Sequence, residues 1–170
     1  MKIIDNFLPN YQFKQLQSLF MESNFPWYNN REIVSGLETD LPLLTHTLFG
    51  KREPWNGISS GYFNSMQIFI NKLKINELYR IKANLNTGTV FHRHTGWHYD
   101  IENVTTAVFY INSNNGYTKF KKGGKVKSVE NRMVIFDSNL EHAGFTCTDE
   151  NVRVVLNFNY TTYPKPRIIK

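Results

Sequence analysis

Apolar and polar residues alternate through the second half of the chain, and this alternation restricts the fold more than any other feature. Over 79–86 the even-numbered positions, from Arg80 to Asn86, are polar and the odd-numbered ones are apolar. This is the period of a strand with one covered face. Further strand-like runs occupy 105–112, 117–121, 125–129, 132–136 and 152–160. Because turn residues separate them, they predict an antiparallel sandwich or jelly roll.

The first half of the chain carries helical signals instead. Residues 3–8 predict a short initial strand, and Pro9 with Asn10 can begin a helix. Apolar residues recur at helical spacing after Pro9 and again over 59–74, which predicts two helices. Prolines interrupt the region between them, which we interpret as loop with a short helix around 43–48. Because helices precede strands, we predict a mainly β fold (α+β) with the N-terminal helices packed on one outer face of a sheet.

Length and composition limit the class of protein. The chain has 170 residues, 41% of them hydrophobic, which predicts a single domain over 1–170. Cys147 is the only cysteine, which excludes an intrachain disulfide and indicates a reducing, cytoplasmic setting. Asp5 interrupts the region where a signal peptide needs apolar residues, and no stretch is apolar enough to cross a bilayer. The abundance of Asn, Lys, Ile, Phe and Tyr is typical of an AT-rich phage or bacterial genome.

The strongest chemical signal is the tripeptide that runs from His98 to Asp100, followed later by His142. Residues i and i+2 of an extended chain point to the same side, so His98 and Asp100 can address one point. His142 comes just after the strand-like run 132–136 and its turn. Two imidazoles and one carboxylate leave three positions open on an octahedral ion, an arrangement that selects non-haem Fe(II). Alone, a His-x-Asp tripeptide is common by chance, so its interpretation depends on its surroundings.

Arg153 lies on the otherwise apolar strand 152–160. One face of this strand is apolar throughout, and Arg153 shares the other face with Val155, Asn157 and Asn159. A buried guanidinium needs a partner, and it binds a carboxylate through two parallel hydrogen bonds. A dicarboxylate inside the barrel would be such a partner. The alternatives are an exposed position at the strand end and an ion pair with Glu150.

Taken in order, these segments resemble the 2-oxoglutarate/Fe(II) oxygenases, and most of all their prolyl-4-hydroxylase-like branch. The order is a His-x-Asp tripeptide, a strand, a glycine-containing hairpin, a strand that ends in Phe, a distal histidine and an arginine on the last strand. The resemblance covers 78–162, with a looser match in the N-terminal helix. The segments that carry it are 97–100, 108–112, 115–120 and 133–138, together with His142 and Arg153.

The resemblance implies a double-stranded β-helix (jelly-roll or cupin-like) and an enzyme that hydroxylates a C–H bond with release of succinate and CO2. It implies that Fe(II) is ligated by His98, Asp100 and His142. It implies that Arg153 binds the distal carboxylate of 2-oxoglutarate, and that Asn84 and Tyr110 line the cosubstrate pocket. O2 is the second cosubstrate, and ascorbate is an optional addition. The implied substrate is a prolyl or other protein residue, or a small molecule.

Two alternatives stay open. A cupin-like metalloenzyme that does not use 2-oxoglutarate would ligate its metal through His92 and His94; otherwise these two lie at the rim or contact substrate. A non-enzymatic jelly-roll module would use a basic hairpin to bind protein or nucleic acid, although a solvated hairpin is the simpler interpretation. The hairpin lysines are Lys119, Lys121, Lys122, Lys125 and Lys127. The net charge of +6 allows a nucleic-acid partner but does not favour one.

Trp27, Trp55 and Trp97 can line a groove or fill the core.

Overall fold

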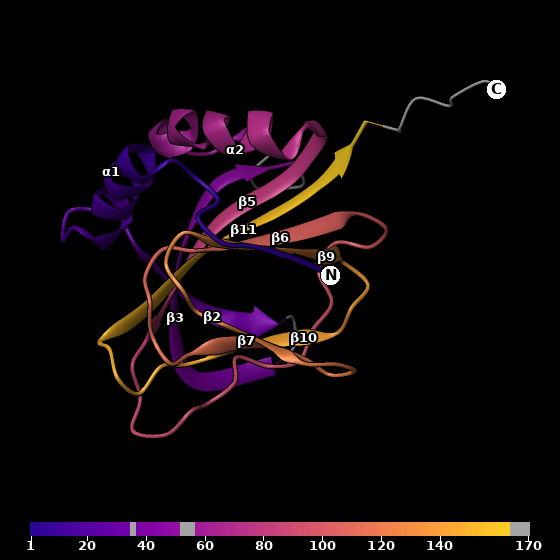
Figure 1. Ribbon diagram of the computed structural model, residues 1–170. Coiled ribbons are helices and arrows are strands. Elements are labelled where there is room, and N and C mark those ends of the chain that lie inside the picture. The colour runs from indigo at the N-terminus through magenta and orange to yellow at the C-terminus, as the bar shows by residue number, and fades with distance from the viewer. Residues whose placement is uncertain (35–36, 52–56, 164–170) are drawn as a thin grey trace.

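The computed structural model describes residues 1–34, 37–51 and 57–163. Its strands form a large sheet and a small sheet that face each other, with all pairs antiparallel (Figure 1). In order across the large sheet lie β1 (Lys2–Ile4), β9 (Arg132–Asp137), β6 (Thr105–Tyr110), β11 (Val152–Thr162), β5 (Ile75–Thr87), β3 (Leu37–Gly50) and β2 (Tyr28–Val34), with β4 (Gly57–Ile58) beside β3. The small sheet has the order β10 (His142–Phe145), β7 (Tyr117–Phe120) and β8 (Lys125–Lys127). The predicted jelly-roll class is confirmed.

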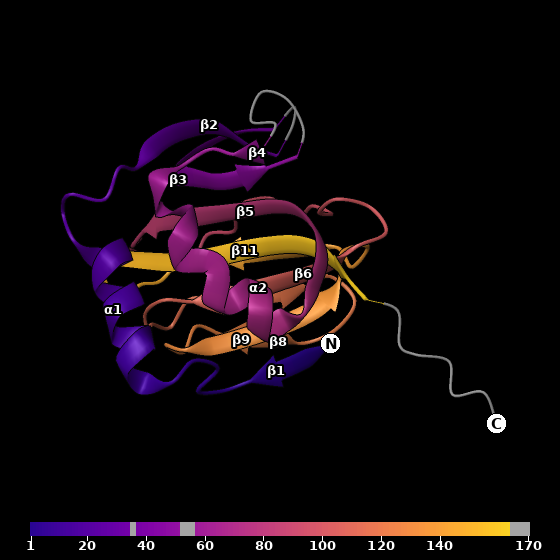
Figure 2. The same cartoon turned by 90° about the horizontal axis from the view of Figure 1, so that it is seen from above.

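Both predicted helices lie on the outer face of the large sheet (Figure 2). The first, α1 (Asn10–Met21), buries Phe13, Leu16 and Phe20 against it. The second region begins as a 3-10 helix (Gly61–Met66) and continues as α2 (Gln67–Leu73). The position of the helices on one outer face therefore agrees with the prediction. In the described part of the chain, no helix is long and apolar enough to span a membrane.

The predicted loop and short helix around 43–48 are wrong, because these residues lie within the long strand β3. Leu43 pairs with both Asn30 on β2 and Asn86 on β5. Leu43 faces the space between the sheets, whereas Leu48 is buried in the core beneath the helices. A strand covered on both faces has no clear alternation, so its periodicity does not distinguish it from a helix. Pro42 lies where the pairing with β2 shifts register, a position that a sheet tolerates.

The large sheet separates two apolar cores. The core between the sheet and the helices is rich in aromatic residues, and Phe109 contacts Phe7, Phe13 and Phe69 there. The smaller core lies between the two sheets and is formed by Val108, Tyr110, Phe120, Val126, Val134, Phe136 and Val155. Alternation along β11 sends its side chains to opposite cores, as its sequence pattern predicts. The inner core fills only part of the space between the sheets, and the remainder is a pocket.

Candidate metal centre

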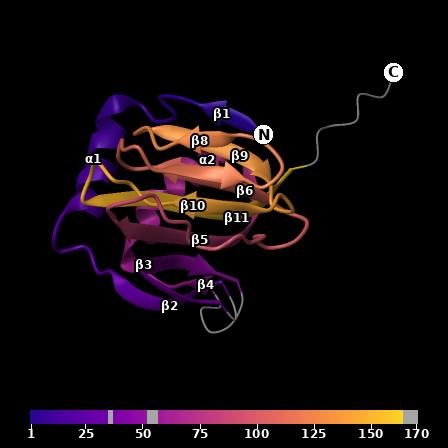
Figure 3. The same cartoon turned by 90° about the horizontal axis from the view of Figure 1, so that it is seen from below.

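The pocket lies between the two sheets and has a volume of about 700 Å³. Seen from the side opposite the helices, the small sheet lies across the middle of the large one (Figure 3). Strands β5 and β11 contribute polar side chains to the lining, and Leu43, Ile101, Val108 and Val155 contribute apolar ones. The segment that carries His98 borders the small sheet through isolated bridges from His94 to Phe145 and from His98 to His142. Most of the lining is polar or charged, and the volume lies in the range that is usual for a small-molecule site.

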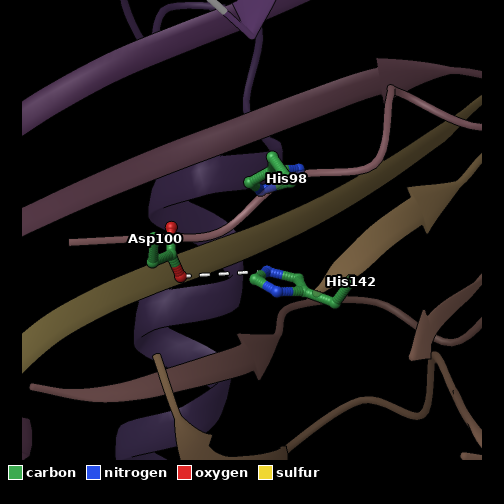
Figure 4. Close-up of side chains that lie close together, drawn as sticks. All are labelled: His98, Asp100 and His142. Atoms are coloured by element: carbon green, nitrogen blue, oxygen red, sulfur yellow. Dashed lines mark ion pairs between the residues drawn. The ribbon is translucent and has the colours of Figure 1, made fainter. Parts of the chain in front are cut away.

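The structure brings His98, Asp100 and His142 together on the pocket wall (Figure 4). The backbone amides and carbonyls of His98 and His142 exchange two hydrogen bonds of 3.0 Å, which aligns the two imidazoles. One ligand atom from each of the three residues lies within 4.8 Å of the others. His142 Nε2 is 3.8 Å from Asp100 Oδ2. This is the donor set, two imidazoles and one carboxylate, that suits Fe(II) with open positions.

Backbone carbonyls set the tautomer of both histidines. His98 Nδ1 lies 3.0 Å from Gly96 O, and His142 Nδ1 lies 2.9 Å from Leu140 O. Since a carbonyl oxygen only accepts, each Nδ1 carries the proton and donates it. In the neutral ring, Nε2 then keeps the lone pair that a metal ligand requires. Burial lowers the pKa of His142 despite the opposing effect of Asp100, which favours the neutral, metal-binding form.

Asp100 is buried and surrounded by donors. Arg80 Nη2 donates to Oδ1 at 2.7 Å, and the Thr106 hydroxyl donates to Oδ2 at 2.8 Å. Burial by itself raises the pKa of Asp100, but the positive charge of Arg80, the imidazoles of His142 and His98 and the Thr106 hydroxyl outweigh it, so the pKa lies below its usual value. Asp100 therefore presents an ionised carboxylate to the metal position. Nothing in the sequence pattern predicted the contact with Thr106.

Arg153 lies in the same pocket and is only 2% exposed. Its Nε donates to Ser128 Oγ at 2.8 Å and its Nη2 to Thr118 Oγ1 at 3.1 Å. No carboxylate of the described residues forms an ion pair with it, so neither the exposed position nor the pair with Glu150 is found. Burial lowers the pKa of the guanidinium, but arginine stays charged in proteins. A buried cation without an acidic partner fits an anionic ligand such as a carboxylate.

Asn84 and Tyr110 lie at different depths. Asn84 is half-buried and lines the pocket between the metal position and Arg153. Tyr110 is fully buried behind the lining, where its hydroxyl donates to Thr118 Oγ1 at 2.9 Å. Its ring centroid is 5.5 Å from Arg153 Cζ. Tyr110 therefore supports Arg153 from beneath and reaches the pocket only through Thr118, a residue that the sequence analysis did not identify.

The other predicted positions lie away from this cluster. Among the described residues, the histidines His92 and His94 join no group of potential metal ligands. Both are exposed; His92 Nδ1 lies 2.7 Å from Thr146 O, and the His94 ring packs near Trp97 and Phe145. The ligand set of the cupin alternative is therefore not assembled. Trp27 packs against the outer core, and Trp55 lies outside the described residues.

The lysines of the predicted basic hairpin are all exposed, on β7, β8 and the turn between them. Lys121 forms an ion pair with Glu141 at 2.7 Å, and the Lys125 ammonium lies 4.5 Å from the ring centroid of Tyr117. Cys147 is free and buried, and burial raises the pKa of its thiol.

Comparison with known proteins shows similarity in structure but not in sequence. No family model matches the chain, and no curated protein matches it. A 2OG-Fe(II) oxygenase family oxidoreductase from Burkholderia pseudomallei aligns with a TM-score of 0.64 and 11% identity, over 95% of this chain and 84% of that one. A prolyl hydroxylase from Trichoplax adhaerens was solved with a peptide of hypoxia-inducible factor. It aligns with a TM-score of 0.61 and 14% identity, over 94% of this chain and 82% of that one. A Pseudomonas putida prolyl-4-hydroxylase aligns with a TM-score of 0.56 and 15% identity, over 96% of this chain and 92% of that one.

These alignments span nearly the whole chain, so the similarity includes the helices as well as both sheets. Because the sequence identities are low, the alignments establish the fold but not the chemistry. The double-stranded β-helix predicted from the resemblance is confirmed. The chain has the fold of the 2-oxoglutarate/Fe(II) oxygenases, in the form that prolyl hydroxylases adopt.

Proposed function

We propose that this chain is an Fe(II)- and 2-oxoglutarate-dependent dioxygenase that hydroxylates a C–H bond, and that the whole chain, 1–170, acts as one oxygenase domain. The observation that carries the proposal is the pairing of two sites in one pocket. A cluster of metal-ligand type, His98, Asp100 and His142, shares that pocket with Arg153, a buried cation that has no acidic partner in the described part of the chain. The similarity in fold to oxygenases supports this assignment, since the chemistry of the site and the fold point to the same reaction.

Each residue has a separate task. His98 and His142 hold the metal through Nε2 and Asp100 holds it through a carboxylate oxygen, whose charge Arg80 and Thr106 stabilise. Arg153 binds the distal carboxylate of 2-oxoglutarate and thereby orients the cosubstrate toward the metal. The bound iron and 2-oxoglutarate supply the oxygen activation and the decarboxylation that yields succinate and CO2. The apolar part of the lining excludes water from the reacting groups.

For the primary substrate we propose only a chemical class. The prolyl hydroxylases among the structural neighbours favour a prolyl or other residue of a protein, and the pocket also has room for a small molecule beside the cosubstrate. O2 is the second cosubstrate, and ascorbate serves as an optional reductant of the iron.

The test is succinate formation from 2-oxoglutarate by protein loaded anaerobically with Fe(II) and then exposed to air. Wild type is compared with His142→Ala, which removes a ligand, and Arg153→Met, which keeps the volume but removes the charge. We expect His142→Ala to abolish turnover. Arg153→Met should weaken 2-oxoglutarate binding by about 10- to 100-fold, because hydrogen bonds to a charged group are worth about 1.5–3 kcal/mol. Arg132→Met is the matched control, since Arg132 pairs with Asp5 away from the pocket.

Binding is measured in the same samples, because turnover without the primary substrate is slow in a coupled oxygenase. Fe(II) and 2-oxoglutarate binding are followed anaerobically by calorimetry, and circular dichroism verifies that each variant is folded. Wild-type protein that binds neither Fe(II) nor 2-oxoglutarate would contradict the proposal. Equal 2-oxoglutarate affinity in wild type and Arg153→Met would remove Arg153 from the cosubstrate site.

A further inference from the structure

A second cation, the half-buried Lys82, lies in the pocket at the end opposite to Arg153. Lys82 is on the pocket face of β5 and pairs in register with Asn157 on β11. Asn157 Nδ2 is 3.4 Å from Asp100 Oδ2, which places Lys82 at the metal end. Arg153 pairs with Asn86 instead. Four residues of a strand separate the two positions on β5, a distance of about 13 Å, so Lys82 and Arg153 serve different parts of the pocket.

Lys82 has no acidic partner of its own among the described residues. Its side chain is half-buried, and it takes part in no hydrogen bond or ion pair there. The nearby carboxylate of Asp100 is already bound to Arg80 and Thr106. Glu102, the other acidic residue of the lining, is exposed and makes no ion pair with Lys82. Burial, with a smaller contribution from the charge of Arg80, lowers the pKa of Lys82 to about 8. The charge of Asp100 opposes this shift only in part, so Lys82 lacks a paired counter-charge among the described residues.

The cosubstrate does not supply that counter-charge. Under the proposed function, the distal carboxylate of 2-oxoglutarate binds Arg153 and its proximal carboxylate binds the metal. Both of its negative charges are then neutralised by other cations. The partner of Lys82 must therefore come from the primary substrate.

An unsatisfied acceptor next to Lys82 adds a second requirement. Asn157 Oδ1 is buried and has no hydrogen-bond partner among the residues that the structure describes. The amide cannot simply be reversed, because its Nδ2 points to the Asp100 carboxylate, which only accepts. A ligand at this position therefore needs an N–H or O–H donor close to its anionic group. Arg80 also lines this end of the pocket, but its Nη2 is bound to Asp100, whereas Lys82 has no ion pair among the described residues. One compact cation such as Lys82 suits a single negative charge.

We propose that the primary substrate presents a carboxylate to Lys82, with an adjacent N–H or O–H group that donates to Asn157 Oδ1. Free amino acids and hydroxy acids carry this combination, as do Asp and Glu side chains next to a peptide N–H. This inference rests on the proposed function, because it assigns the substrate class of the same site.

The experiment is protection of Lys82 from an amine-reactive reagent, acetic anhydride, followed by peptide mass spectrometry. The protein is loaded with Mn(II), which does not turn over, and is labelled with and without N-oxalylglycine to fill the cosubstrate position. The probes are L-aspartate, L-glutamate and L-malate as free acids, and blocked tripeptides with central Asp or Glu as peptide acids. Each peptide is compared with its Asn or Gln counterpart, and each free acid is compared with its diamide, which has no carboxylate. Exposed Lys122 is the internal reference.

We expect at least one acid to protect Lys82 while its amide does not. At an acid concentration of about ten times its Kd, labelling should slow by about tenfold, since the free site falls by 1 + [L]/Kd. Protection by a free acid and protection by a peptide distinguish the two sources. Lys82→Arg should still bind the protecting acid in calorimetry, whereas Lys82→Gln should lose it and keep N-oxalylglycine binding.

Two results would overturn the inference. One is labelling of Lys82 that none of the acids slows. The other is protection by N-oxalylglycine alone, which would make Lys82 part of the cosubstrate site. Failure of the proposed function can be told apart from failure of this inference. The first appears as absence of N-oxalylglycine binding, whereas the second is judged from protection by the acids, which are also tested without N-oxalylglycine.

Discussion

At the scale of single residues, the pocket holds a buried cation, Arg153, and a half-buried one, Lys82, and the protein provides them with different numbers of polar partners. Arg153 has two hydroxyl partners and an aromatic ring beneath it, whereas Lys82 has neither hydrogen bond nor ion pair among the described residues. The charge of Asp100 offsets the burial of Lys82 only in part, so burial destabilises the charged form of this lysine. The free protein therefore carries a free-energy penalty that a bound anion would relieve.

This penalty predicts a pH-dependent gain in stability for Lys82→Met. The pKa of Lys82 is about 8 in the folded protein, whereas the ordinary lysine value of 10.5 applies to the unfolded chain. Below pH 8 the lysine is charged in both states and the full penalty applies. As pH rises to 10.5 the folded state loses the proton first, so the penalty disappears. We expect Lys82→Met to raise the free energy of unfolding by about 1–3 kcal/mol at pH 7, and by progressively less toward pH 10.

Urea unfolding at both pH values measures this effect. The charged groups near Lys82 are Arg80 and Asp100, and both are present in wild type and variant, so their titration cancels in the difference. Lys122→Met at the exposed hairpin should change stability by less than about 0.5 kcal/mol at either pH. A Lys82→Met protein that is no more stable than wild type at pH 7 would show that the lysine is well solvated.

At the scale of elements, the hairpin before β7 is shaped around Arg153. A Cβ atom added at Gly116 would lie 2.8 Å from Arg153 Cδ and 2.9 Å from the backbone oxygen of Phe145. Both distances are shorter than real Cβ contacts, and the backbone of β10 cannot move freely because it is paired with β7. Glycine is therefore required here for close approach and not for a turn conformation.

We accordingly predict that Gly116→Ala displaces Arg153. The 2-oxoglutarate affinity should fall by about tenfold or more, and overpacking should lower stability by about 1–3 kcal/mol. Anaerobic calorimetry and thermal unfolding measure the two effects. Gly124→Ala, after the β7 turn, is the matched control, because a Cβ there meets nothing within 4 Å. Unchanged affinity in Gly116→Ala would contradict the role of this contact.

At the scale of the whole molecule, the large sheet isolates the stabilising core from the reacting pocket. Phe109 on β6 points to the helices and is fully buried among aromatic rings, while its neighbour Val108 points to the pocket. The helices of this fold are therefore a covering layer that stabilises the sheet, and the site residues lie on the other face.

This separation predicts that Phe109→Ala lowers the free energy of unfolding by about 3–5 kcal/mol, through lost burial and a cavity. At a temperature where the variant is still folded, its Fe(II) affinity should equal that of wild type. Denaturant unfolding and metal titration measure the two properties. Phe91→Ala makes the same chemical change at a side chain that is 78% exposed, and should have little effect on stability. Weaker metal binding in folded Phe109→Ala would show that the two layers are coupled.

The sequence by itself determined the features that depend on residues close together in the chain. The alternation in 79–86 and along β11 predicts which side chains enter the pocket, and the i, i+2 spacing brings His98 and Asp100 to one side. The helical periodicity after Pro9 predicts α1. These features are local because the geometry of a strand or helix sets the direction of each side chain.

Only the tertiary structure decided the contacts between distant segments. It places β3 in the sheet, where pairing with two neighbours outweighs the effect of Pro42 and the helix-like pattern. It brings His142 to His98 through paired backbone hydrogen bonds, and it fills the surroundings of Asp100 and Arg153 with Arg80, Thr106 and Thr118. Such contacts join residues far apart in the chain, and no local pattern encodes them. Their geometry arises when two sheets close over one another, since only then do the side chains of both sheets share one pocket.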